Sequence, residues 1–201
     1  FIDALVLAKL DELNIDPSPV SSDTEFLRRA YLDAAGILPT PEEVERFAAD
    51  ARPDKRARAI DALLEREEFV DYWAYKWSDL LLVSSRRLAS NAMWSYYRWI
   101  RDSVAANKPW DRMAREVVTA SGNTLSNGAA NYYVLHKDPI DVTENVAMTF
   151  MGFSITCARC HNHPLEKWTQ KDYYGYANLF ARVANKTDGG VATVYSAPAG
   201  D

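Results

Sequence analysis

The 201-residue chain has 28 acidic and 23 basic side chains, and its net charge of −5 gives no basic surface for nucleic acid. Apolar residues make up 48% of the sequence and aromatic residues 12%, which indicates a folded interior and excludes general disorder. No apolar run is long enough to cross a bilayer, and the length suits one domain or slightly more.

The first third of the sequence predicts a series of helices. Residues 1–14 place apolar side chains on one face, which is typical of an amphipathic helix. Ser22 and Thr40 are each followed three residues later by glutamate, a pair that caps the first turn of a helix. Gly36 suits the left-handed position that follows a helix end. Pro53 precedes a further helix with an apolar stripe.

The middle of the chain predicts more helices and one clear loop. Helical apolar stripes begin near Glu68, Asn91 and Met113. Residues 122–128 are dense in glycine, asparagine and serine, so we expect a mobile surface loop that could cover a functional site. Residues 132–135 predict a loop or a lone strand.

The last third contains a predicted helix that leads into the two cysteines of the chain. A helix starting at Thr143 should run past residue 155 and place the cysteines of the next segment on its last turns. Thr169 and Asp172 then cap a final helix that extends to Val183. Beyond residue 186 the sequence has turn residues and no periodicity.

These elements predict an all-α fold, an irregular multi-helix bundle around a cofactor with little or no sheet. Residues 1–185 would form one helical domain, and residues 186–201 a linker or tail towards a missing domain. The sequence opens directly in a helical pattern, so we expect it to be a trimmed part of a longer protein.

One short segment holds both cysteines of the chain and two of its three histidines. Within it, Cys157, Cys160 and His161 have the spacing of c-type haem attachment. Two thiols one turn apart can each add to a vinyl group of one porphyrin, and the next side chain then faces the iron. We therefore expect one covalent haem c, with His161 as the proximal axial ligand.

Two other interpretations of the segment stay open. A redox disulfide between Cys157 and Cys160 needs a thioredoxin-like strand and helix alternation, which the flanking sequence lacks. A structural zinc would use the same cysteines with His161 and His163. Four ligands within seven residues strain a tetrahedron, so such a site would need His136 as a distant ligand.

Three blocks of the sequence resemble a known family. Residues 22–29, residues 36–43 and the block 157–174 are similar to the planctomycete cytochrome-like family, and specifically to its second, cytochrome-like domain of unknown function. The resemblance covers about residues 1–185. It implies an exported parent protein, periplasmic or at the cell surface, with haem c attached outside the cytoplasm. It also implies neighbouring domains, a cytochrome c domain and a C-terminal domain, as redox partners.

The ligand on the far side of the iron is not given by the motif. Met148 and Met151 would lie on the same predicted helix as His161, and His163 is only two residues from it, so all three should stay on the near side. The remaining side chains of suitable type are His136, Met93 and Met113. We favour His136, which precedes the haem-bearing helix by a loop.

Other residues of the block are expected around the cofactor. His163 would hydrogen-bond a haem propionate or a backbone carbonyl, and the guanidinium of Arg159 suits a propionate carboxylate. Trp168 and Tyr173 would pack near the ring edge, although ordinary core packing explains them equally well.

Three functional classes follow for such a domain. The first is electron transfer by a six-coordinate haem c. The second is a haem enzyme or ligand sensor, which needs an open distal position. The third is a structural or interaction domain that haem or zinc holds together. We expect electron transfer and assign no catalytic residue.

Overall fold

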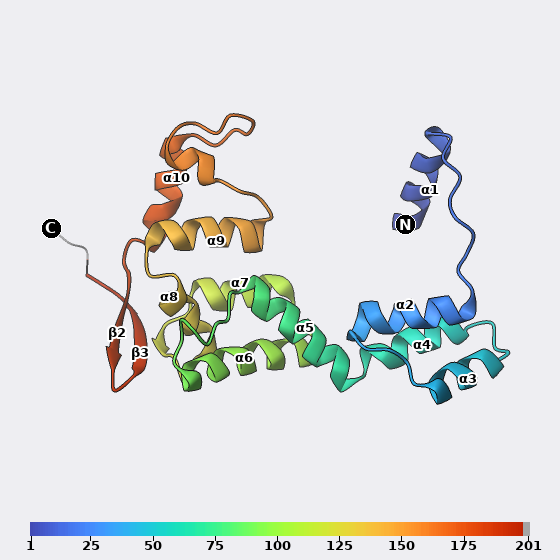
Figure 1. The fold of residues 1–201 in the computed structure, drawn as a ribbon. Helices are drawn as coiled ribbons and strands as arrows, with labels where there is room; N and C mark the ends of the chain where they lie inside the picture. The colour runs from blue at the N-terminus through green and yellow to red at the C-terminus, as the bar shows by residue number, and fades with distance from the viewer. Residues whose placement is uncertain (199–201) are drawn as a thin grey trace. The chain divides into compact units, whose positions relative to one another are not determined.

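The computed structural model describes residues 1–198, which form two compact units. The first unit runs from Phe1 to Phe69, and the second begins at Val70. Figure 1 shows that helices make up most of both units, together with one small sheet near the C-terminal end of the described residues. The expectation of a mostly helical chain with little sheet is therefore confirmed, and the small sheet is an addition to the predicted all-α class.

The first unit contains four helices in the described chain: α1 (Ile2–Glu12), α2 (Asp23–Ala35), α3 (Pro41–Ala49) and α4 (Lys55–Leu64). Both predicted capping boxes are present, from Ser22 with Glu25 and from Thr40 with Glu43. Gly36 ends α2 with a φ of 68°. The apolar side chains between α2, α3 and α4 form the core of this unit: Leu27, Tyr31, Ala35, Phe47 and Leu63.

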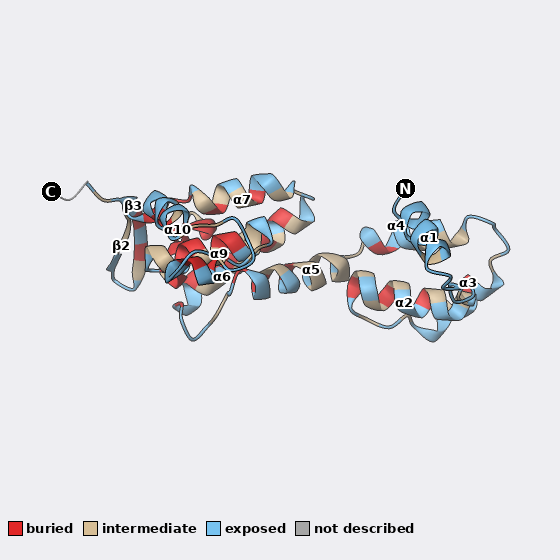
Figure 2. Cartoon of the chain, turned by 90° about the horizontal axis from the view of Figure 1, so that it is seen from above, coloured by how far each residue is buried: buried red, intermediate tan, exposed pale blue. Residues whose placement is uncertain are grey.

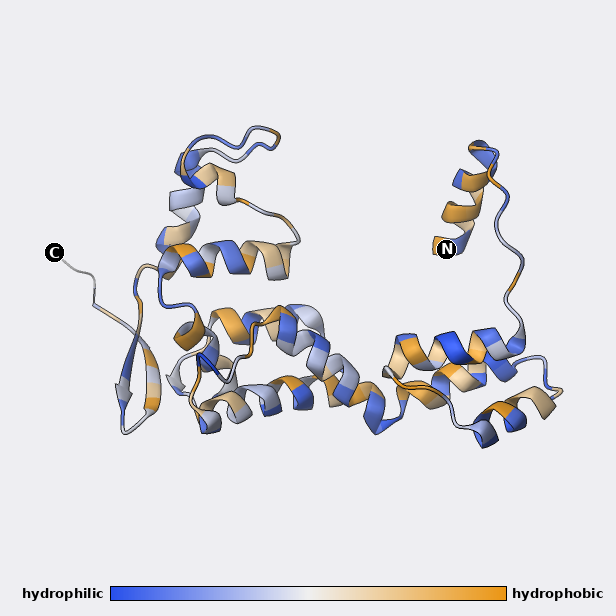
Figure 3. Ribbon diagram, in the orientation of Figure 1, coloured by the Kyte–Doolittle hydropathy of each residue, from blue (hydrophilic) through white to orange (hydrophobic). Residues whose placement is uncertain are grey.

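Helix α1 differs from this packed group. It has no buried residue, and Ile2, Leu5 and Val6 of its apolar set are exposed. Figure 3 shows this hydrophobic colouring along α1. The predicted helix is confirmed, but none of its apolar side chains is buried within the described chain.

Helix α5 (Glu67–Leu80) spans the boundary between the two units. Its residues up to Phe69 belong to the first unit, and those from Val70 onward belong to the second. Further helices are α6 (Ser90–Ala105), α7 (Trp110–Val118), α8 (Tyr132–Leu135), α9 (Pro139–Met151) and α10 (Gln170–Ala177). Three short 3-10 turns, η1 (Gly128–Asn131), η2 (Thr156–Arg159) and η3 (Asn178–Phe180), connect them. Figure 2 shows buried residues gathered on the inner sides of these elements. The largest fully buried side chains there include Tyr96, Ile100, Val117, Tyr132 and Leu135.

A three-stranded antiparallel sheet closes this unit, with the order β1 (Gly122–Asn123), β3 (Val191–Ser196), β2 (Val183–Asp188). Gly189 and Gly190 join β2 to β3 at positive φ angles of 54° and 81°, the backbone that a tight hairpin turn requires. Val194 is buried in the core of the unit. The residues after 186 are thus part of the folded unit up to β3, and the expected linker is corrected accordingly.

Two more expectations are wrong in the same region. The final helix ends at Ala177, well before Val183, because the chain turns through η3 into β2. Residues 132–135 form the short helix α8, and the pairing strand comes from residues 122–123.

The loop 122–128 was expected to be mobile, and the structure instead shows it held in place. Thr124 is fully buried, and its hydroxyl donates to the carbonyl of Ala192 at 2.9 Å. Ser95 Oγ and Asn131 Nδ2 both donate to the Thr124 carbonyl, at 3.0 and 2.9 Å. Such satisfied buried hydrogen bonds stabilise one conformation of the loop.

Gly128 ends this loop in close contact with α6. A Cβ at this position would lie 2.4 Å from the Ser95 carbonyl oxygen and 2.7 Å from the Trp99 Cβ. We predict that Gly128→Ala lowers the free energy of unfolding by about 1–3 kcal/mol, as overpacking of a core does. Gly175→Ala in α10, where nothing lies within 4 Å, is the control and should raise it by about 0.5–1 kcal/mol. Urea denaturation measures both, and equal effects would contradict the described packing.

Candidate functional site

Helix α9 leads into the cysteine segment but does not contain it. Pro139 occupies its first turn, and the Asp138 carboxylate accepts from the Ile140 amide at 2.7 Å. The helix ends after Met151, where Gly152 adopts a φ of 70°. Gly152 is the left-handed residue that terminates many helices. The expectation that the cysteines lie on the last turns of this helix is therefore wrong.

The segment instead forms the separate 3-10 turn η2 (Thr156–Arg159). Four buried side chains hold this turn against α9 and α10: Ala147, Ile155, Ala158 and Tyr173. The Tyr173 hydroxyl donates to Glu144 Oε1 at 2.7 Å, so it also links α10 to α9 by a hydrogen bond. We call these four residues the anchoring cluster. They position the segment through Ala158, the buried one of the two residues between the cysteines; the other, Arg159, is exposed.

Cys157 and Cys160 lie outside this cluster. Both thiols are exposed and free, so no disulfide joins them. The Cys157 carbonyl accepts from the amides of Cys160 and His161, each at 3.3 Å, which closes one turn over the motif. The two exposed cysteines are thus three positions apart across a single tight turn.

His161 has a defined tautomer. Its Nδ1 lies 2.7 Å from the backbone carbonyl oxygen of Asn162. Because a carbonyl only accepts, Nδ1 must carry a proton, so in the neutral ring the lone pair is on Nε2. Histidines that bind metals commonly donate the other ring nitrogen in this way. The Asn162 side chain in turn accepts from the Gln170 amide at 3.0 Å, which ties the motif to α10.

His163 has the opposite arrangement. Its Nδ1 accepts from the amides of Leu165 and Glu166, at 3.3 and 3.0 Å, so its proton is on Nε2. Its own amide donates to the Trp168 carbonyl at 2.8 Å. The predicted bond from His163 to a backbone carbonyl is replaced by these amide contacts, and its Nε2–H remains available for the predicted propionate.

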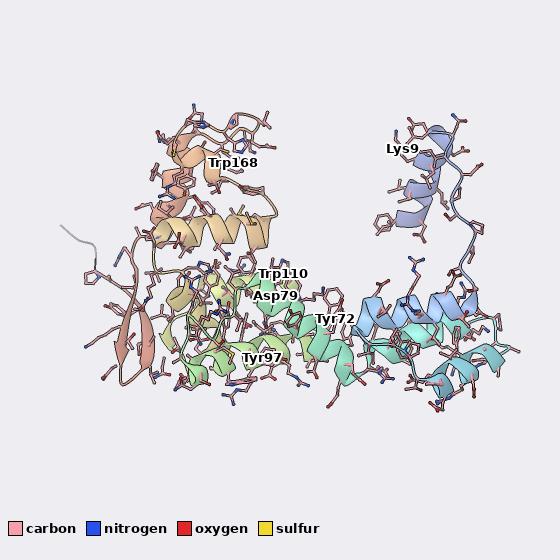
Figure 4. The ribbon with its side chains drawn as sticks, in the orientation of Figure 1. Lys9, Tyr72, Asp79, Tyr97, Trp110 and Trp168 are labelled. Atoms are coloured by element: carbon pink, nitrogen blue, oxygen red, sulfur yellow. The ribbon has the colours of Figure 1, made fainter. Side chains whose placement is uncertain are left out.

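The expected neighbours of the cofactor surround the same turn. Arg159 is exposed, and its carbonyl accepts from Gln170 Nε2 at 3.1 Å and from the Tyr174 hydroxyl at 3.3 Å. Trp168, labelled in Figure 4 beside the chain that leads into α10, stacks on Phe153 with ring centroids 5.0 Å apart. Tyr173 is buried in the anchoring cluster, and this burial raises the pKa of its hydroxyl.

A largely apolar cavity of about 520 Å³ lies between the end of α9, the segment after it and α10. Its size falls within the range of about 300–1,000 Å³ found for cofactor and ligand sites. The sequence analysis places two of its lining residues, Trp168 and Tyr173, near the cofactor and misses the others. Recognising Gly152 as the end of the helix after Met151 could have suggested them. The lining is Met151, Phe153, Ile155, Trp168, Lys171, Asp172, Tyr173, Gly175 and Tyr176.

His136 lies apart from this cavity. It ends α8, is 6% exposed, and its ring centroid is 4.7 Å from that of Tyr132. Figure 1 shows α8 on one side of α9 and α10 on the other. The structure therefore does not bring His136 together with His161, and its role as a distal ligand stays a prediction.

The structure gives no support to a zinc site. Among residues 1–198, no group of three or more His, Cys, Asp or Glu side chains is placed to hold a metal ion. His163 Nδ1 is engaged by two amides, and His136 lies in the core of the unit.

A second hollow, of about 420 Å³, lies in the first unit among α2, α3 and α4. Its cations are largely engaged in ion pairs: Arg52 with Asp50, Lys55 with Asp23, and Arg66 with Glu43 and Glu68. Paired charges at a surface of this kind stabilise the unit modestly and leave little free charge for a ligand.

Residues 1–185 of the 201 match the model of the family PSCyt2, described as a protein of unknown function (DUF1549). The chain belongs to this family. The matched range ends within β2, and the described fold continues past it through the hairpin. Comparisons with curated proteins and with solved structures found no match. None of the helices in the described residues has the length and apolar character to cross a membrane.

The burial of His136 predicts a pH dependence of stability. Burial, together with the charge of Arg87, lowers its pKa from 6.5 to about 4. Between pH 6.5 and 4 the unfolded chain therefore binds a proton that the native chain does not, so stability falls as the pH falls. The loss reaches roughly 3 kcal/mol at pH 4.

The measurement is urea denaturation of the wild type and of His136→Gln at several pH values between 7 and 4. Carboxylates titrate in both proteins, so the difference between the two curves isolates the histidine. The wild type should lose stability more steeply than the variant. Parallel curves would contradict the described burial of His136.

Proposed function

We propose that this domain holds one covalent haem c, through thioether bonds from Cys157 and Cys160 and coordination by His161 Nε2. The single observation that carries the proposal is the hydrogen bond from His161 Nδ1 to the Asn162 carbonyl. In the neutral ring it selects the tautomer whose Nε2, the nitrogen that would face a metal, holds the lone pair. A histidine without such a partner has to select this tautomer on binding.

The other residues of the segment fit the same group. Both thiols are free and exposed, as attachment by an external maturation system requires. The apolar cavity lined by Ile155, the residue before η2, has walls that suit a flat apolar ring, including the stacked pair Trp168 and Phe153, although neither cysteine nor His161 is among its lining residues. Arg159 and the Nε2–H of His163 are polar groups near the same turn that would pair with propionates.

The function that these features favour is electron transfer within a larger exported protein. A bound haem c would supply a one-electron carrier at this site. The chain would position it by the anchoring cluster and hold it near the surface, because the cysteines are exposed. Neighbouring cytochrome and C-terminal domains of the parent protein, or a separate redox protein, would be the partners. The location that fits the attachment chemistry is periplasmic or extracellular.

Replacement of the cysteines tests the attachment. In cells with haem-maturation machinery, the wild type should gain the mass of one haem, and the double variant Cys157→Ala with Cys160→Ala should gain none. Each single variant keeps at most one thioether bond and should carry less haem. The matched control is Ser154→Ala, an exposed position three residues earlier, which should retain full attachment.

Intact-protein mass spectrometry after denaturation distinguishes covalent from bound haem. Attached haem in the double variant, or its absence from the wild type with free thiols recovered, would refute the proposal.

A further inference from the structure

The apolar cavity between the end of α9 and α10 is not accounted for by the cysteine motif. Neither cysteine nor His161 is among its lining residues, so a haem bonded to those three side chains does not by itself fill it. Met151, Lys171 and Gly175 belong to the lining and are exposed, which gives a small molecule access from solvent. The cavity therefore has the size and the opening of a ligand site without an assigned ligand.

The walls of this cavity are aromatic, and their polar groups are already engaged. Phe153 and Trp168 stack with their ring planes 13° apart and form one part of the lining. Tyr173 and Tyr176 form another part, and their hydroxyls donate to a carboxylate and to a thioether sulfur of α9, at 2.7 and 3.3 Å. Water needs several free polar partners to bind in a cavity, whereas a flat aromatic ring makes stacked and edge contacts with such walls.

Two charged residues complete the lining, and they differ in their partners. Asp172 Oδ2 accepts from the hydroxyl and the amide of Thr169, at 2.7 and 3.0 Å, and these bonds hold the pKa of the carboxyl below its usual value. The dipole of α10 also stabilises a carboxylate in its first turn. The Lys171 ammonium, in contrast, forms neither a hydrogen bond nor an ion pair with residues 1–198. The charge that remains for a ligand is therefore positive, and its complement is an anion.

Gly175 keeps the α10 side of the cavity open. It lies four residues after Lys171, on the same face of the helix, and a Cβ built on it meets no atom within 4 Å. A glycine inside a helix lowers its stability relative to alanine, although the backbone here has space for a side chain. The absence of that side chain leaves room that a larger residue would occupy.

We propose that this cavity binds a small aromatic acid, a flat ring system with one negative charge, at a site separate from the haem attachment. The ring lies against the aromatic walls, and the acid group pairs with the Lys171 ammonium at the open side. This inference goes beyond the proposed function and does not require it, because no residue of the cysteine motif takes part.

Two probes with the same rings separate the charge from the apolar contacts. Anilinonaphthalene sulfonate carries one negative charge, and N-phenyl-naphthylamine is its neutral counterpart. Isothermal titration calorimetry of the chain should show tighter binding of the anionic probe. Lys171→Gln should weaken binding of the anionic probe by about two- to fivefold, as loss of an exposed ion pair does, and leave the neutral probe unchanged. Lys186→Gln on β2 is the matched control and should change neither.

A second variant tests the cavity itself. Gly175→Leu places a side chain in the cavity and should abolish binding of both probes, while urea denaturation shows a stability no lower than that of the wild type. Ala181→Leu, at an exposed position outside the lining, is its control and should bind both probes normally. Normal binding by Gly175→Leu, or no binding by the wild type, would overturn the site. An unchanged affinity of Lys171→Gln for the anionic probe would overturn the choice of an acid.

The matured protein tests whether the site is separate from the haem. It should bind the anionic probe as tightly as the chain without haem does. Loss of this binding on haem attachment would overturn the separate site and leave the proposed haem in place. Probe binding by a chain that attaches no haem would leave the site in place and overturn the proposed function alone.

Discussion

The geometry of the site depends on the packing of the anchoring cluster. Ala158 lies between the two cysteines and is fully buried against Ala147, Ile155 and Tyr173, so the turn that carries the motif is held by its one apolar residue. The neighbouring thiols are thereby exposed. A larger residue at 158 would overpack this contact and displace the whole turn, since well-packed cores tolerate added volume poorly. Two members of the same cluster, Ile155 and Tyr173, also line the apolar cavity.

Local signals in the sequence predicted the helices well, and long-range pairing was missed. The capping boxes at Ser22, Thr40 and Thr169 involve only residues three positions apart, so a sequence pattern specifies them fully. Residues 183–196 form a hairpin of β2 and β3, and the free edge of β3 pairs with residues 122–123. That pairing joins segments about 70 residues apart and leaves little local pattern.

The same contrast holds within the candidate site. The spacing of Cys157, Cys160 and His161 is a local pattern, so the sequence alone is enough to predict the attachment chemistry proposed for it. The end of α9 was misjudged because the apolar periodicity continues past Gly152 to Ile155 and masks the helix end. The tautomer of His161 depends on a backbone carbonyl, to which every residue type contributes equally, so no sequence pattern reports it.

The central claim is that both cysteines bind one haem whose iron His161 coordinates. The pyridine haemochrome spectrum of the matured wild-type protein tests this most directly, because its visible bands shift when vinyl groups become saturated thioether carbons. The account predicts the spectrum of haem with two thioether bonds, at one haem per chain. A spectrum with unsaturated vinyl groups, or none at all, would contradict it.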